Sequence, residues 1–98
     1  RREVRLDGGL LTLGRKEYAL LTLLLKHAGR VVTQPQVLRE IWGSTHTSDT
    51  HYVRILVGKL RQKLGDNPAA PHYIATEPGV GLRFLAEGSK AGQEPQAR

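Results

Sequence analysis

The spacing of apolar residues divides the chain into short alternating stretches and longer helical ones. Near the N-terminus apolar and polar residues alternate from Val4 to Leu6 and again from Leu11 to Leu13. The Asp-Gly-Gly triplet at residues 7–9 lies between these stretches and is a turn signal. The simplest interpretation of this region is a β-hairpin.

Three later segments have helical spacing. Residues 15–29 are apolar over most of a helix circumference and finish with a glycine cap, which indicates a helix buried by several neighbours. A second helix is predicted after Thr33, an N-cap candidate with proline two residues later, and it ends at Gly43. A third is predicted from Thr50 to Gly65, where Asp-Asn-Pro stops it.

Two β segments and a polar tail complete the pattern. Val31-Val32 can form a short strand, and residues 72–85 contain two β-like runs around Glu-Pro-Gly-Val, where Pro-Gly fits a type II turn. Residues 87–98 have almost no apolar surface to bury and are predicted to be disordered. Residues 1–86 therefore predict one α+β winged helix-turn-helix domain, with a small N-terminal antiparallel sheet, three helices and a C-terminal β-hairpin wing.

Composition excludes several kinds of chemistry. The 98 residues contain no Cys, so disulfides and thiolate zinc sites are excluded. His46, Asp49 and His51 match no tight metal spacing, and no phosphate loop or nucleophile–base arrangement is found. We therefore expect no metal, cofactor or enzymatic activity. The polar N-terminus and the short apolar run of residues 18–25 predict neither a signal peptide nor a membrane span, which needs ~20 residues.

Charge is concentrated in the third helix. The formal net charge is +6, and residues 50–65 hold Arg54, Lys59, Arg61 and Lys63 without any acidic residue. Residues 1–17, in contrast, mix both signs. A concentrated basic stripe is the footprint expected of a nucleic-acid-binding protein.

A helix advances about 100° per residue, which sorts the third helix into two faces. One face is an apolar stripe made of Val53, Leu56, Val57, Leu60 and Leu64. Opposite it lie His51, Ile55, Gly58 and Gln62, with Arg54 and Lys59 on the flanks and Arg61 and Lys63 nearer the boundary. Such a face suits the major groove, because cations can meet phosphates while small, polar or methyl-bearing groups meet base edges. A glycine within a helix costs about 1 kcal/mol relative to alanine, so a merely solvated face leaves Gly58 unexplained.

The chain also resembles the effector domain of OmpR/PhoB-type response regulators, which are winged-helix transcription factors. The segments LGRKEYALLTLLLKHAGRVVTQPQVLREIWG, HYVRILVGKLRQKLGDNP and IATEPGVGLRF carry the resemblance, which covers residues 4–85. Among subfamilies, THYVRI, GKLRQKL and IATEPGVG are most similar to the Kdp-type regulator of potassium-transport genes.

This resemblance implies sequence-specific binding of double-stranded DNA and transcriptional regulation as the output domain of a cytoplasmic two-component phosphorelay. Residues 50–64 would be the recognition helix, residues 72–85 the wing, and the loop 43–48 the segment that approaches RNA polymerase. A receiver domain, a sensor kinase and a head-to-tail dimer on direct repeats are further implied partners. The expected DNA-binding residues are His51, Arg54, Ile55, Gly58, Lys59, Arg61, Gln62, Lys63, Thr33, Trp42 and Arg83.

Three residues depart from the family pattern. Pro78 stands where many relatives have Arg, so the wing lacks a cation for the minor groove, although Arg83 can still contact phosphate. Leu82 replaces the usual Tyr, and Gly14 replaces a Thr, which weakens capping of the first helix. Trp42 and Thr33 are expected to be mainly structural, as a core residue and an N-cap.

Two other functions stay open. A basic RNA- or ribosome-associated module would need exposed aromatic residues to stack bases, and Tyr52 and Tyr73 are the plausible ones. A protein-interaction domain would use the face around Ile55. Salt dependence separates these possibilities, because a phosphate-dominated complex weakens steeply with salt and a mainly apolar one does not.

Overall fold

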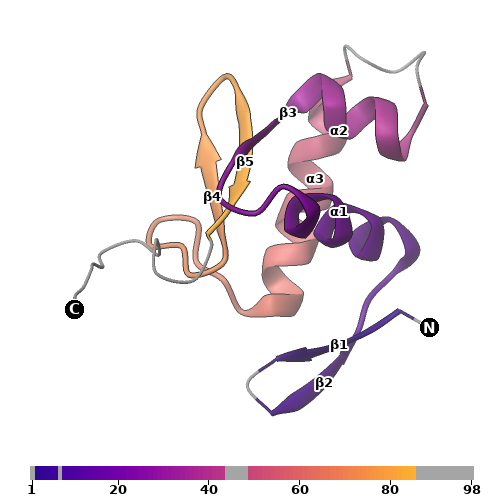
Figure 1. The fold of residues 1–98 in the computed structure, drawn as a ribbon, viewed down its shortest axis with the longest axis vertical. Coiled ribbons are helices and arrows are strands. Elements are labelled where there is room, and N and C mark those ends of the chain that lie inside the picture. Colours follow the sequence, from indigo (N-terminus) through magenta and orange to yellow (C-terminus); the bar gives the residue numbers. More distant parts are fainter. Residues whose placement is uncertain (1, 7, 44–48, 86–98) are drawn as a thin grey trace.

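A computed structural model describes residues 2–6, 8–43 and 49–85, and it has the predicted order of elements (Figure 1). These are β1 (Glu3–Leu6), β2 (Gly9–Thr12), α1 (Arg15–Lys26), β3 (Val31–Thr33), α2 (Gln34–Ile41), α3 (Thr50–Leu64), β4 (Ile74–Glu77) and β5 (Gly81–Phe84). The α+β winged helix-turn-helix prediction is confirmed. Most of the loop expected to approach RNA polymerase (44–48) and the tail expected to be disordered (87–98) lie outside the described residues.

The three helices surround a core of leucine and valine, and α3 crosses behind α1 in the view of Figure 1. Leu20 and Leu24 of α1, Leu38 of α2 and Leu60 of α3 are completely buried. α1 ends at Lys26, three residues before the predicted glycine end. The next N–H groups tighten the turn by bonding to carbonyls three residues back, and Gly29 then leaves the helix at φ +83°.

The wing belongs to a three-stranded antiparallel sheet in the order β3-β5-β4. At its tip the Val80 N–H donates to the Glu77 carbonyl (2.9 Å) and Gly79 has φ +73°, which confirms the predicted type II turn. The pairing of β3 with β5 places Gly81 opposite Thr33. A Cβ on Gly81 would overlap the Val32 carbonyl, so this close backbone approach requires glycine.

The start of β4 is held in place by Asp66, just beyond the end of α3. Gly65 is left-handed at φ +69° and ends the helix. The buried Asp66 carboxylate accepts the backbone N–H groups of His72 (2.7 Å), Tyr73 (3.1 Å) and Ile74 (3.0 Å). This side chain therefore fixes the wing relative to α3.

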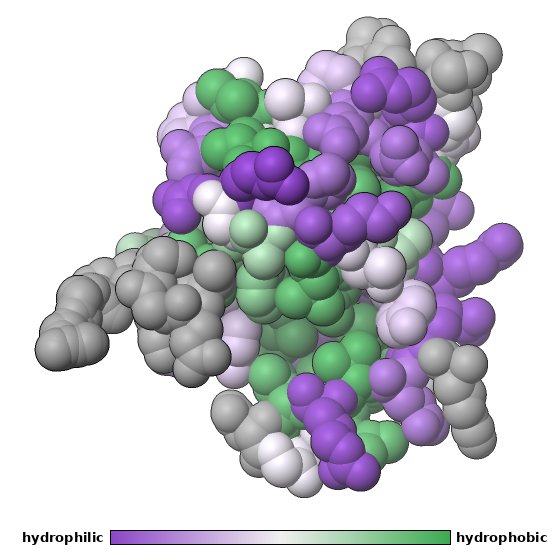
Figure 2. All heavy atoms as spheres, in the orientation of Figure 1, coloured by the Kyte–Doolittle hydropathy of each residue, from purple (hydrophilic) through white to green (hydrophobic). Residues whose placement is uncertain are grey.

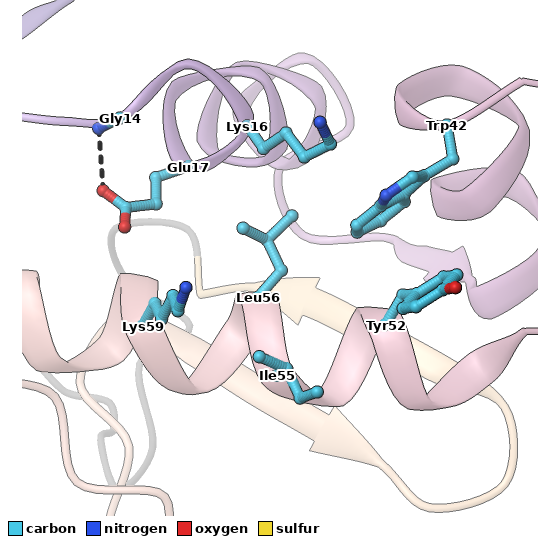
Figure 3. A pocket seen from close by; sticks show the side chains of 8 residues that line it. All are labelled: Gly14, Lys16, Glu17, Trp42, Tyr52, Ile55, Leu56 and Lys59. Atoms are coloured by element: carbon cyan, nitrogen blue, oxygen red, sulfur yellow. Dashed lines mark hydrogen bonds between the residues drawn. The ribbon is translucent and has the colours of Figure 1, made fainter.

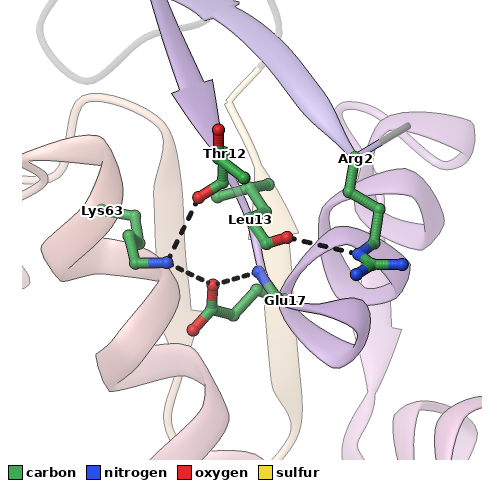
Figure 4. A network of polar contacts seen from close by, with 6 residues as sticks. Arg2, Thr12, Leu13, Glu17 and Lys63 are labelled. Carbon is green, nitrogen blue, oxygen red and sulfur yellow. Dashed lines mark hydrogen bonds and ion pairs between the residues drawn. The ribbon is translucent and has the colours of Figure 1, made fainter.

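Glu17 joins the start of α1 to the end of α3 (Figure 4). Its Oε1 accepts the backbone N–H of Gly14 (2.8 Å) and an N–H of Lys63 Nζ (2.9 Å), and Lys63 also donates to the Thr12 carbonyl (3.3 Å). The Lys63 hydrogen bond, followed by the one from Gly14, lowers the pKa of Glu17. Glycine offers no capping side chain of its own, and Glu17 supplies half of a capping box instead.

Hydrophobic side chains also reach the surface between the β1–β2 hairpin and the helices, as Figure 2 shows. Leu10 of the hairpin is 55% exposed and Leu25 of α1 is 48% exposed. Within the described residues, no helix is both long and apolar enough to cross a membrane.

Candidate nucleic-acid interface

The exposed face of α3 is the one that the helical period predicts. His51, Arg54, Ile55, Gly58, Lys59 and Gln62 are all exposed, whereas every residue of the apolar stripe is buried. Ile55 is 56% exposed, although isoleucine usually lies inside a protein. We call these six residues the α3 face.

Gly58 has no structural reason to be glycine within the described chain. It lies inside a regular helix, and a Cβ added to it would meet no atom within 4 Å. Alanine would therefore fit and would be the better helix former by about 1 kcal/mol. The small residue leaves room for something outside the domain to approach the helix closely.

A hollow of about 240 Å³ lies beside the α3 face, between the start of α1 and the end of α2 (Figure 3). Trp42 and Tyr52 stack within it, with ring centroids 5.5 Å apart, and Leu56 lies at its base. Lys16 places its Nζ 5.8 Å from the centre of the Trp42 ring, and Lys59 lines the side nearer the start of α1. Trp42 packs against the core as expected, while its ring also forms part of this hollow.

A second, smaller hollow of about 120 Å³ lies on the opposite flank of α3, next to the wing. Arg54 and Arg61 line it together with Thr76 of β4. The Arg61 guanidinium donates to the Ile74 carbonyl (2.9 Å) and to Thr76 Oγ1 (2.8 Å). Burial lowers the pKa of Arg61, and nearby Asp66 opposes that effect. The α3 face is thus flanked by two hollows, and two basic residues line each of them. Lys16 and Lys59 line the larger hollow, and Arg54 and Arg61 line the smaller one.

Other residues expected at the interface have partners within the chain. Arg61 holds β4, and Lys63 holds Glu17. Thr33 caps α2 as predicted, since its Oγ1 accepts the N–H of Gln36 (3.2 Å). On the wing, Arg83 forms an ion pair with Glu77 at 3.1 Å. Their contacts with nucleic acid stay predictions.

Lys16 was missed by the sequence reasoning. Lys16 lies between Arg15 and Glu17, so the local sequence shows no basic patch there. The helical period of residues 15–29 also does not reveal that this residue lies close to α3. The packing of the start of α1 against α3 brings it to the hollow beside the α3 face. Among the described residues, no group of three or more His, Cys, Asp or Glu side chains is arranged to hold a metal ion.

A protein-family model described as "Transcriptional regulatory protein, C terminal" matches residues 8–84. The chain belongs to this family. The members of this family are DNA-binding domains of transcriptional regulators, and the family is not a class of enzyme. The predicted resemblance to OmpR/PhoB-type response regulators is confirmed.

Curated relatives include two regulators with the same name. The KDP operon transcriptional regulatory protein KdpE of Escherichia coli is 48% identical over 69 residues, which cover 70% of this chain and 31% of that protein. The transcriptional regulatory protein KdpE of Mycobacterium tuberculosis is 38% identical over 80 residues, covering 82% and 35%. The chain therefore spans about a third of the length of these relatives.

Solved structures agree with the fold. The Klebsiella pneumoniae RstA DNA-binding domain, in complex with the RstA box, has a TM-score of 0.80 at 30% identity, with 86% of this chain and 83% of that one covered. The DNA-binding domain of CpxR from E. coli has a TM-score of 0.73 at 30% identity, covering 87% and 83%.

Proposed function

We propose that this domain binds duplex DNA sequence-specifically through α3 in the major groove, as the output domain of a cytoplasmic two-component response regulator that controls potassium-transport genes. The observation that carries the proposal is the α3 face, with cations on its flanks and a glycine that the fold does not need. Similarity to the KdpE proteins supports the choice of target genes.

Residues of the α3 face divide by the kind of contact that each can make. Gln62 and His51 can hydrogen-bond to base edges, and Ile55 can meet a thymine methyl group. Gly58 lets the helix backbone approach the floor of the groove. Lys59 lies on the flank of the face and can reach either a base edge or a phosphate.

The wing is proposed to lie against the neighbouring minor groove and to set the orientation of the domain. Pro78 and Gly79 form its turn and bring no cation to that groove. Arg83 lies near the middle of the sheet, where its Nε and Nη2 both donate to Glu77 Oε2, so part of its guanidinium is already engaged within the wing. We therefore assign base readout to α3 rather than to the wing.

The remaining partners are proposed from the family resemblance alone. They are a receiver domain, a cognate sensor kinase, a second copy arranged head-to-tail on direct repeats, and RNA polymerase reached through the loop 43–48.

Selection from a random duplex DNA library at near-physiological salt tests the proposal. Enrichment of a short direct repeat is the expected result. Unenriched binding would mean that the basic surface only attracts phosphates, and the assignment of base contacts to α3 would be wrong. Preference for single-stranded RNA would support an RNA-associated module, and a salt-independent protein complex blocked by Ile55→Asp would support a protein-interaction domain.

Lys59→Ala sharpens this test. We expect it to weaken binding to the selected site by about 1–3 kcal/mol and to relax one base preference. The matched control is Lys26→Ala, in the last turn of α1, which should bind like the wild type. An equal loss on all DNA would instead make Lys59 a phosphate contact.

A further inference from the structure

The hollow between α1, α2 and α3 carries an excess of positive charge. Lys16 from α1 and Lys59 from α3 both line it, and among the described residues that line it Glu17 alone carries a carboxylate. Glu17 already accepts hydrogen bonds from the backbone of Gly14 and from Lys63. The hollow is therefore suited to an anionic group from outside the domain.

Lys16 lies beside this hollow, next to two stacked aromatic rings. Its ammonium lies 5.8 Å from the centre of the Trp42 ring, and Trp42 in turn stacks on Tyr52 of α3. Figure 3 shows Lys16 reaching from α1 toward the indole, above the helix that carries Ile55 and Lys59. The stacked rings thus link the position of Lys16 to that of the α3 face.

We propose that this hollow receives the phosphate backbone of one DNA strand, with Lys16 as the phosphate contact, on the α1 side of the hollow. The proposal rests on the proposed function. A helix is about 10–12 Å wide with its side chains and the major groove is about 12 Å wide, so phosphates run along both flanks of an inserted helix. On one flank Arg54 lines the smaller hollow, and on the other Lys16 extends the positive surface beyond α3 itself.

The test compares Lys16→Gln with Lys26→Gln in the 98-residue chain. Both substitutions remove one positive charge from α1, but Lys26 lies in its last turn, outside the hollow. The affinity for the selected duplex is measured as a function of salt. For Lys16→Gln we expect the log–log slope to become shallower by about 0.9, with unchanged sequence preference, whereas Lys26→Gln keeps the wild-type slope.

Neutral methylphosphonates placed one at a time along the duplex locate the contact. We expect one phosphate whose neutralisation weakens binding of the wild type and has no further effect on Lys16→Gln. Thermal unfolding of each variant measures any structural role of the contact between Lys16 and Trp42.

Each result decides the proposal. A Lys16→Gln variant with the wild-type slope overturns it, and a lower melting temperature with that same slope would assign Lys16 to packing. Equal changes in both variants would show a general charge effect and would also overturn it. Wild-type protein that enriches no duplex sequence would refute the proposed function itself, and the inference would fall with it.

Discussion

Gly58→Ala should make the free domain more stable and the DNA complex weaker. The added Cβ meets no atom within 4 Å, so alanine introduces no steric cost in the free protein. Alanine exceeds glycine in helix propensity by about 1 kcal/mol, and the free energy of unfolding should rise by about that amount. For a domain of this size the melting temperature should increase by roughly 4–8 °C.

Binding should change in the opposite direction. In the proposed complex, a methyl group at position 58 would lie between the helix backbone and the floor of the major groove. The helix would then have to move outward or lose the contacts proposed for Ile55 and Gln62. We expect at least a tenfold loss of affinity for the selected duplex, which corresponds to about 1.4 kcal/mol.

Urea unfolding and fluorescence anisotropy with labelled duplex measure the two effects. Thr22→Ala is the matched control, because Thr22 is exposed on α1 and gains helix propensity away from the α3 face. It should stabilise the domain and leave affinity unchanged. A Gly58→Ala protein that binds as tightly as the wild type would refute the close approach, and a destabilised one would refute the open space around Gly58.

Three other substitutions test how the α3 face is supported. Gly81→Ala should destabilise the domain by about 1–3 kcal/mol in urea unfolding, because its Cβ would overlap the Val32 carbonyl; wild-type stability would contradict the close pairing of β3 and β5. Asp66→Ala should lower the free energy of unfolding by about 3 kcal/mol or more, since three N–H groups lose their acceptor; a loss under about 1 kcal/mol would mean that water replaces the carboxylate. Glu17 has a lowered pKa when folded, so its contribution to stability is present above the unfolded pKa and lost as pH falls through the folded one. Unfolding of Glu17→Gln measured against pH should therefore lack part of the acid-induced loss seen in the wild type, and identical curves would exclude a role for its bond to Lys63.

The order of elements and the two faces of α3 were predictable because they depend on local spacing. The helical period separates the buried Val57 from the exposed Ile55, and Pro-Gly specifies the wing turn whatever surrounds it. Thr33 was recognised as an N-cap for the same reason. Such features need only the nearest few residues.

Long-range pairings were not predictable in this way. Arg61 was expected to meet phosphate, but its donors reach Ile74 and Thr76 of β4, which lie 13 and 15 residues away in the chain. Asp66 looked like a helix stop and is also a buried acceptor of three N–H groups. In both cases the partner comes from a strand whose position depends on the whole core.

The attachment of Arg61 to β4 has a mechanical consequence for DNA recognition. Two hydrogen bonds, together with the Asp66 carboxylate, tie the wing to α3. In the proposed complex, α3 and the wing would therefore meet the major and minor grooves at a fixed spacing and angle, and the duplex would have to deform to fit them. Sequences whose base steps bend or narrow at little cost should then be preferred even at positions that no side chain touches.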